Sequence, residues 1–308
     1  MGSSGGLNIS TEVTTWEQLA QAVQNIGPDV NPQTIRTSGT LLAPLHAKST
    51  ASDRTFQVQK DVKYGSADEQ VLDLYEPGMN SPRGIVVFVH GGAFVGGTKQ
   101  RPDSPYHANV GSWAARTGRF GVVMDHRLAP EAQWPAGAED VRAVSDWCRA
   151  NLRAYDGTEL PVHLVGDSSG AVHVATHIVG GPGLNQPERL PTSASFLSGV
   201  YDLKAFGHDR VRAYFGDDQD LLIEMNIAER LADSPVPQLF SVGEFDTPDA
   251  HTQFLGVLKV MAELRGQFPR ITRVRAANHF TAVHAIGTDL DDLGPTLEGF
   301  MMEIEKTS

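Results

Sequence analysis

From about residue 57 onward, short apolar runs alternate with longer segments of helical periodicity. Unbroken apolar runs of this length are typical of strands buried on both faces. The runs lie at residues 84–90, 119–127, 160–166, 193–199, 237–243 and 271–276. The helical segments lie at about residues 105–117, 137–154, 170–179, 249–266 and 291–305. Strands that alternate with helices in this way predict an α/β fold, a mostly parallel sheet covered by helices on both faces.

Two further strand-like runs, FQVQKDVKYG and EQVLDLYEPG, come first and are separated only by SAD. This spacing predicts a hairpin that adds antiparallel strands at one edge, which makes about eight strands. Two segments interrupt the alternation: residues 1–55, with the helix-like TWEQLAQAVQNIG and a Pro/Thr/Ser-rich stretch, and the helical, charged residues 203–235. We expect residues 1–308 to form a single domain in which these two segments supply a small helical cap.

The composition excludes several classes of protein. The net charge of −12 argues against nucleic-acid and anionic-membrane partners. No apolar run approaches the roughly 18 residues of a transmembrane helix, and the first residues lack the pattern of a signal peptide. The single cysteine, Cys148, lies in a helical pattern and fits a packed thiol in a reducing compartment. We therefore expect a soluble cytoplasmic protein.

The stretch LVGDSSGAVH places two adjacent serines between a predicted strand and a predicted helix. In a nucleophile elbow, the serine occupies a sharp turn that forces together the residues two before and two after it, so both must be small. Around Ser168 these residues are Gly166 and Gly170. Around Ser169 one of them is Asp167, which would crowd the turn. We predict that Ser168 is a nucleophile and that the backbone N–H of Ser169 is an oxyanion donor.

A second motif, VFVHGGAFVGG, follows the predicted central strand, where His90 leads into Gly91, Gly92 and Ala93. A glycine-rich turn at this position can aim backbone N–H groups into a pocket, as a tetrahedral oxyanion requires. The alternative interpretation is a flexible loop with turn glycines. We expect His90 to hold the turn by hydrogen bonds rather than to act in catalysis.

An acid of a catalytic triad is expected in the loop just past a strand. The segment LFSVGEFDTPDAHTQF offers three carboxylates there. We rank Asp246, in the loop, ahead of Glu244, nearer the strand, and Asp249, which has the position of a helix-start residue.

Two histidines follow the last predicted strand and are candidates for the base. His279 lies in the loop and is preferred, because a base needs freedom to reach the serine, whereas His284 lies in a segment that is already helix-like. His173 and His177 have the spacing of a helical metal pair, but no Glu separates them and no third ligand is evident, so we expect a packed helix face and no metal.

Together these motifs resemble the hormone-sensitive-lipase-like branch of the α/β-hydrolases over roughly residues 60–306. HGGAFVGG looks like the HGGG oxyanion loop of that branch, DHRLAPE like its YRLAPE segment, and GDSSG like its GDSAG elbow, while SGVYDL is also similar. The resemblance implies an α/β-hydrolase fold without metal or organic cofactor. It implies the following roles: Ser168 as nucleophile, Asp246 as acid, His279 as base, the N–H groups of Gly92, Ala93 and Ser169 as oxyanion donors, and Gly91 as support for the turn.

The chain departs from the family pattern at several positions. Ala93 replaces the last glycine of HGGG, where only the N–H is needed, His126 replaces the tyrosine of YRLAPE, and Ser169 replaces an alanine. The NHF sequence around His279 is closer to kynurenine-formamidase-like relatives. The choice between ester and amide substrates therefore stays open.

The leading hypothesis is a carboxylesterase-like serine hydrolase that cleaves small carboxylic esters through an acyl-enzyme. The alternatives are a C–N hydrolase with the same triad, such as an arylformamidase or small-amide amidase, and a non-catalytic binding protein of the same fold. The substrate groups are set by the cap, where Tyr214, Phe215, Leu221 and Leu222 either line a pocket or pack the cap. A homodimer is expected from the family likeness alone.

Overall fold

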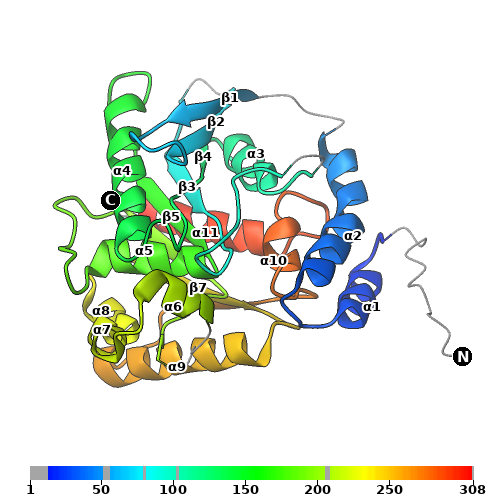
Figure 1. Cartoon of the computed structure of the whole chain (residues 1–308). Helices are drawn as coiled ribbons and strands as arrows, with labels where there is room; N and C mark the ends of the chain where they lie inside the picture. Colours follow the sequence, from blue (N-terminus) through cyan, green and yellow to red (C-terminus); the bar gives the residue numbers. More distant parts are fainter. Residues whose placement is uncertain (1–12, 51–55, 79–80, 102–103, 205–208, 307–308) are drawn as a thin grey trace, which may run out of the picture.

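The computed structural model describes residues 13–50, 56–78, 81–101, 104–204 and 209–306. Within these residues a sheet of eight strands has the order β1-β2-β4-β3-β5-β6-β7-β8 (Figure 1). The strands are β1 (Phe56–Lys63), β2 (Val71–Pro77), β3 (Ile85–Val89), β4 (Phe120–Met124), β5 (Val162–Asp167), β6 (Ser193–Leu197), β7 (Gln238–Gly243) and β8 (Arg270–Val274). β1 and β2 pair antiparallel, as do β2 and β4, and the other pairs are parallel. The predicted mostly parallel sheet with an antiparallel edge is confirmed.

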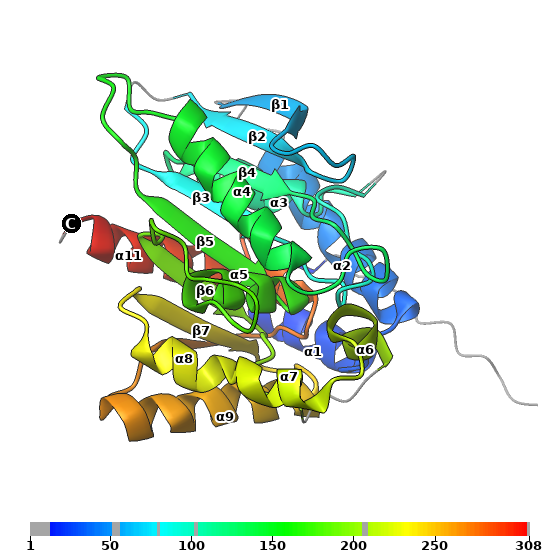
Figure 2. The same cartoon turned by 60° about the vertical axis from the view of Figure 1, so that its left-hand side comes forward.

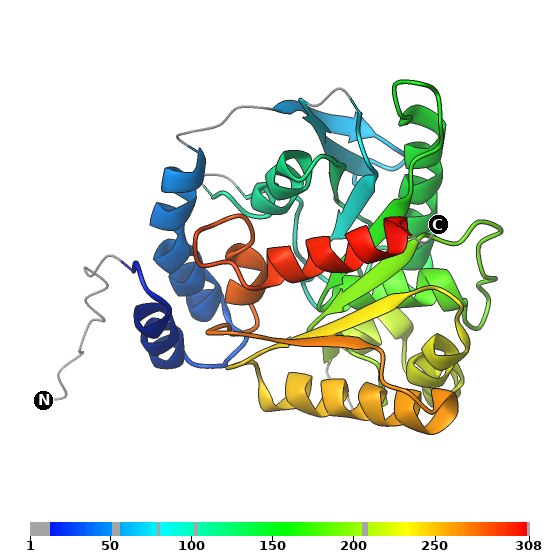
Figure 3. The ribbon, with the colours of Figure 1, turned by 180° about the vertical axis from the view of Figure 1, so that it is seen from behind.

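Helices cover both faces of this sheet. They are α1 (Trp16–Ile26), α2 (Pro32–Thr50), α3 (Ala108–Arg116), α4 (Ala136–Asn151), α5 (Ser169–Val179), α6 (Asp209–Phe215), α7 (Gln219–Met225), α8 (Ile227–Asp233), α9 (Pro248–Arg265), α10 (Thr281–His284) and α11 (Leu293–Glu305). α4, α5, α8 and α9 lie toward the viewer in Figure 2, whereas Figure 3 shows α3, α10 and α11 across the opposite face. Among the described helices, none combines the length and apolar character that crossing a bilayer requires.

The alternation of side chains along β3 shows how the two cores arise. Ile85, Val87 and Val89 pack into the core shared with α4, α5 and α9. Val86 and Phe88 point to the opposite face and pack with α3 and α11. Because successive strand residues face opposite sides, a strand between two helix layers must be apolar throughout. This is the physical reason for the unbroken apolar runs in the sequence.

The N-terminal helices form a third apolar cluster against the segment that follows β8. α1 was expected, but the Pro/Thr/Ser-rich stretch after it also forms a helix, α2, which sequence reasoning missed. The Asn31 side chain accepts hydrogen bonds from the N–H groups of Gln33 and Thr34 at the start of α2. Leu41, Leu42 and Leu45 bury the inner face of this helix, so tertiary packing outweighs its weak helical signal.

The helical segment 203–235 separates into elements with different neighbours. Figure 2 shows α6 apart from α8 and α9. α8 packs between α5 and α9 and buries Ile227 and Leu231 completely in the main core. α6 instead contacts the loop after β3 through its aromatic side chains. Of the predicted cap segments, 1–55 and 203–235, residues 1–12, 51–55 and 205–208 lie outside the described residues. The single-domain prediction stays a prediction.

Candidate active site

The turn between β5 and α5 gives Ser168 a positive φ, with φ 52° and ψ −117°. Such a conformation is uncommon for a residue with a side chain and is typical of strained functional turns. A Cβ on Gly166 would lie 2.6 Å from the Cα of Ala171, and one on Gly170 would lie 2.2 Å from the carbonyl oxygen of Val89. Both positions therefore exclude any side chain, which agrees with the spacing argument for Ser168.

Three side chains predicted from the sequence meet at the carboxyl ends of the strands. The Nε2 atom of His279 lies 3.0 Å from the Oγ of Ser168. The Nδ1 atom of the same ring lies 2.8 Å from Oδ1 of Asp246. With the proton assigned to Nδ1, the imidazole donates to the carboxylate and accepts from the serine hydroxyl. This arrangement suits proton transfer from the hydroxyl to the ring.

The charge of Asp246 favours the protonated form of His279. Burial disfavours the imidazolium, but the nearby Asp246 carboxylate, assisted by Asp167, outweighs this and raises the pKa of His279 to about 9. Burial also opposes ionisation of Asp246, but the charge and hydrogen bond of His279 keep the pKa of that carboxyl below its ordinary value. Each member of the pair therefore favours the charged form of the other.

Further hydrogen bonds fix the Asp246 carboxylate. The Ser198 hydroxyl donates to Oδ2 over 2.5 Å, and the Thr247 N–H donates to Oδ1 over 2.8 Å. Ser198 follows β6 directly and has φ 46°. Sequence reasoning did not assign it a role. The available signal was its position at the end of a predicted strand, as the first residue of the SGVYDL segment.

The rival candidates for acid and base lie elsewhere. Glu244 binds the guanidinium of Arg273 and the N–H of Ala276. Asp249 is in the first turn of α9 and is exposed. His284 is buried in α10, and its ring stacks on Tyr106 with centroids 3.7 Å apart. None of the three has a recorded contact with Ser168.

The loop after β3 approaches Ser168 closely at Gly91. A Cβ on Gly91 would lie 2.9 Å from the Cβ of Ser168, so only glycine allows this approach. In the described part of the chain, no hydrogen-bond partner is recorded for the N–H groups of Gly92, Ala93 and Ser169. These N–H groups therefore have no backbone acceptor within the described chain, a condition that oxyanion donors must meet. Ala93 has φ 52°, so the departure from glycine at this position is accommodated in a conformation that glycine would adopt more easily.

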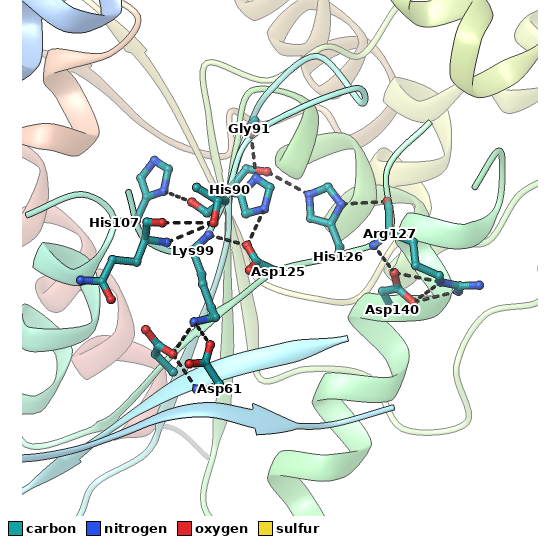
Figure 4. A network of polar contacts seen from close by, with 12 residues as sticks. Asp61, His90, Gly91, Lys99, His107, Asp125, His126, Arg127 and Asp140 are labelled. Carbon is teal, nitrogen blue, oxygen red and sulfur yellow. Dashed lines mark hydrogen bonds and ion pairs between the residues drawn. The ribbon is translucent and has the colours of Figure 1, made fainter. Parts of the chain in front are cut away.

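Asp125 holds both ends of this loop, a role that sequence reasoning missed (Figure 4). It accepts from the backbone N–H of Lys99 over 2.5 Å, and its Oδ1 lies 3.4 Å from Nε2 of His90. The Nδ1 of His90 lies 2.8 Å from the carbonyl oxygen of Gly91, as a turn-holding residue requires. His126, which stands where the similar YRLAPE segment has tyrosine, stacks on His90 with ring centroids 4.3 Å apart.

Lys99 connects the loop to the antiparallel edge of the sheet. Its buried ammonium lies 2.6 Å from Asp73 in β2 and 2.7 Å from Asp61 in β1. Burial disfavours the charged form, but the hydrogen bonds and charges of these two carboxylates outweigh it and raise the pKa of Lys99. The loop is therefore attached to two other parts of the sheet by charged hydrogen bonds, which are stronger than neutral ones.

Asn278 fixes the turn that contains His279. Sequence reasoning did not assign this asparagine a role. Its Oδ1 accepts from the N–H groups of Phe280 and Thr281 over 3.1 and 3.0 Å. Its Nδ2 donates to the Gly27 carbonyl and to the Ser38 hydroxyl. The asparagine of the NHF sequence thus forms an Asx turn around His279 and joins it to the N-terminal helices.

Asp167 is a carboxyl beside the nucleophile that the triad does not use. Its Oδ1 is buried and has no hydrogen-bond partner among the described residues. Burial raises the pKa of Asp167 to about 7, although the positive charges of His279 and His90 oppose this. Its negative form adds to the stabilisation of the imidazolium.

The remaining histidines and the cysteine lie in packed surroundings. His173 and His177 are buried on α5, where His173 contacts the rings of His126 and Phe94. Cys148 is buried in α4, as expected for a packed thiol, and burial raises the pKa of that thiol, which disfavours the reactive thiolate. In the residues that the structure describes, no group of three or more potential ligand side chains is placed to hold a metal ion.

Comparisons with known proteins agree with this architecture. The family model BD-FAE matches residues 72–184. The chain is 29% identical over 157 residues to esterase LipC of Mycobacterium tuberculosis, which covers 48% of this chain and 37% of that protein. It is 32% identical over 107 residues to human hormone-sensitive lipase, covering 34% and 10% respectively. These matches thus span about a third or less of the length of the curated relatives.

A hyperthermophilic esterase from the archaeon Pyrobaculum calidifontis shares the fold, with a TM-score of 0.63 at 19% identity over 95% of this chain and 97% of that one. The predicted α/β-hydrolase fold is confirmed, and so is the resemblance to the hormone-sensitive-lipase-like branch.

Proposed function

We propose that this α/β-hydrolase hydrolyses small carboxylic esters with Ser168 as nucleophile. The observation that carries the proposal is the continuous hydrogen-bonded chain from Asp246 through His279 to Ser168. The esterase and lipase relatives support the same class of reaction.

In the proposed reaction, Ser168 Oγ attacks the acyl carbon while its proton passes to Nε2 of His279. Asp246 stabilises the imidazolium and keeps the proton on Nδ1. The N–H groups of Gly92, Ala93 and Ser169 bind the oxyanion, an interaction of about 3 kcal/mol per donor. The tetrahedral adduct then collapses: the ester C–O bond breaks, the imidazolium protonates the leaving alkoxide, and the acyl group stays bonded to Oγ. A water molecule deprotonated by His279 then attacks the acyl carbon, the bond between that carbon and Oγ breaks, and Oγ regains its proton from the imidazolium as the acid leaves.

The adjacent serines offer a test of the nucleophile. Ser168→Ala removes the attacking oxygen, and we expect a loss of about 10⁶-fold in kcat on a short-chain 4-nitrophenyl ester. Ser169→Ala keeps the backbone N–H and should retain the rate to within about tenfold. A fluorophosphonate probe should label the wild type and the second variant only. Full activity or labelling in Ser168→Ala would overturn the proposal.

The substrate and the location are part of the proposal. A panel of matched esters and amides distinguishes the esterase from a C–N hydrolase, because an amide also requires His279 to protonate a poor nitrogen leaving group. We propose a small acyl ester as the substrate and, from the single buried cysteine, a reducing compartment such as the cytoplasm. Hydrolysis of the amide panel at the rate of the ester panel would favour the amidase.

A further inference from the structure

The aromatic side chains of α6 pack directly against the loop after β3, which contains Gly92, Ala93 and Phe94. The ring of Phe94 lies parallel to that of Tyr214, with centroids 5.0 Å apart and 8° between the planes. Phe215 meets Phe94 edge-on at 5.5 Å. Phe94 and Tyr214 are each 1% exposed and Phe215 is 4% exposed. The sequence left open whether Tyr214 and Phe215 line a pocket or pack the cap, and the structure packs them on the loop that contains the oxyanion donors.

The backbone of this loop is held in an unfavourable conformation. Ala93 and Phe94 are consecutive and have φ angles of 52° and 70°. Residues with a side chain rarely adopt such angles, and a bulky residue does so only where its surroundings hold it. The Phe94 carbonyl accepts from the N–H of Ala129 over 2.9 Å, which fixes one side of the residue. The stack with Tyr214 fixes its side chain.

Tyr214 is itself attached to the segment at the start of α4. Its carbonyl accepts from the N–H of Trp134 over 2.8 Å. Its hydroxyl oxygen accepts from the N–H of Gly137 over 2.9 Å. The ring of His173, from α5, meets Tyr214 at 5.1 Å and Phe94 at 5.5 Å. The tyrosine therefore presents a rigid surface to Phe94, supported by two separate elements.

We propose that Tyr214 is a positioning residue for the oxyanion hole, which it serves by fixing Phe94 and so the N–H groups of Gly92 and Ala93. This inference rests on the proposed hydrolase function. The two N–H groups matter most when charge develops on the carbonyl oxygen, so their misplacement weakens binding of the transition state more than binding of the substrate. A loss of the stack should lower kcat and leave KM nearly unchanged.

The test compares Tyr214→Leu with Tyr214→Phe on 4-nitrophenyl acetate. The leucine removes the stacked ring, and we expect kcat to fall by about tenfold or more, below the 10²–10³-fold loss of a deleted donor. KM should stay within about twofold. The phenylalanine keeps the ring and loses only the bond to Gly137, so it should restore most of kcat. Tyr214→Met, which keeps apolar volume without a planar ring, serves as the second variant if the leucine does not fold.

A transition-state analogue and a stability control separate positioning from general packing. A small alkylboronic acid adds to the serine as a tetrahedral anion, so its affinity should fall by the same factor as kcat. Leu231→Ala, in α8 of the same apolar core, should lower the melting temperature without lowering kcat at 25 °C.

Two outcomes would overturn the inference. One is a Tyr214→Leu or Tyr214→Met variant with the kcat and boronate affinity of the wild type. The other is an equal loss of kcat in Leu231→Ala, which would assign the effect to packing alone. Ser168→Ala distinguishes these from failure of the proposed function, because an active Ser168→Ala enzyme would remove the premise whatever Tyr214 does.

Discussion

At the scale of single residues, the site depends on the hydrogen bonds that the buried carboxylate of Asp246 accepts. Asp246 accepts hydrogen bonds from His279, Ser198 and Thr247. Asp246 and His279 could be predicted from the sequence because each follows a predicted strand. It did not locate Ser198, since its contact with Asp246 joins residues 48 positions apart. A contact of that kind leaves no local pattern of spacing or periodicity.

The coupling between Asp246 and His279 predicts a dependence on pH. The base must be neutral to accept the serine proton, and the Asp246 charge raises the pKa of His279 to about 9. The acidic limb of kcat/KM should therefore have its midpoint near pH 9 in the wild type. In Asp246→Asn the limb should move to lower pH, and kcat should fall by roughly 10⁴-fold because the ring loses its correct tautomer.

A pH–rate profile of both proteins on an ester that is stable in mild alkali checks this prediction. Ser168→Ala measures the background hydrolysis. A wild-type midpoint at or below 6.5, or a limb that does not move in Asp246→Asn, would contradict the electrostatic account.

At the scale of elements, the close approach of β3 to α5 shows why the elbow has its glycines. The Cβ that Gly170 lacks would lie 2.2 Å from the Val89 carbonyl oxygen, in the strand that leads into the oxyanion loop. Ser168 and the loop after β3 are thus brought together by one tight contact between a helix and a strand. The sequence predicted small residues at these positions from the elbow alone, without this contact.

A pair of glycine substitutions tests the contact. Gly170→Ala, in α5, should destabilise the fold by about 1–3 kcal/mol, because the backbone must move to admit the methyl group. Gly256→Ala, inside α9, has nothing within 4 Å of the new Cβ and should stabilise by about 0.5–1 kcal/mol through helix propensity. Urea unfolding of both variants and the wild type gives the two differences. Equal effects of the two substitutions would show that the approach of Val89 imposes no constraint.

At the scale of the whole molecule, a buried polar cluster fastens the C-terminal helix to the sheet at the end opposite the site. Arg119 is completely buried and binds both carboxylate oxygens of Glu305, over 2.8 and 2.9 Å. Glu305 also lies 3.1 Å from Nε2 of His163, whose Nδ1 lies 2.8 Å from the hydroxyl of Ser193. This Ser–His–Glu series resembles a triad, but Ser193 and His163 are fully buried, so we interpret it as structural.

Glu305→Gln should therefore destabilise the protein, by about 3 kcal/mol, since it leaves the Arg119 charge buried without a counter-charge. Burial opposes ionisation of Glu305, but its bonds to His163 and Arg119 outweigh this and lower the pKa of the carboxyl. Its contribution is thus complete above the unfolded-state pKa of about 4.3 and is lost as the pH falls through the lower folded-state value.

Urea unfolding of the wild type and Glu305→Gln measures the difference in their free energies of unfolding. A series from about pH 3 to about pH 8 spans the unfolded-state glutamate pKa of about 4.3. The difference should shrink toward the acidic end, and esterase activity at pH 8 should be unaffected. A difference that stays constant over this range would refute the role of the ionised carboxylate.

What the sequence determined by itself about this protein was local. Each buried strand had its own apolar run, the elbow its own glycine spacing, and the order of Ser168, Asp246 and His279 followed from loops after predicted strands. These features could be predicted because the pleat of a strand and the sharp turn after it constrain residues only a few positions apart.

Only the tertiary structure decided which distant residues support the site. Asp125 and Lys99 hold the loop after β3, Asn278 holds the turn of His279, and Tyr214 stacks on Phe94, yet none of these pairings has a signature in a single sequence. The same holds for α2, whose Pro/Thr/Ser-rich segment becomes a helix because its leucines are buried against the segment after β8. Such contacts form when separate elements pack together, and their free energy depends on the complementary surface rather than on the residues next to them in the chain.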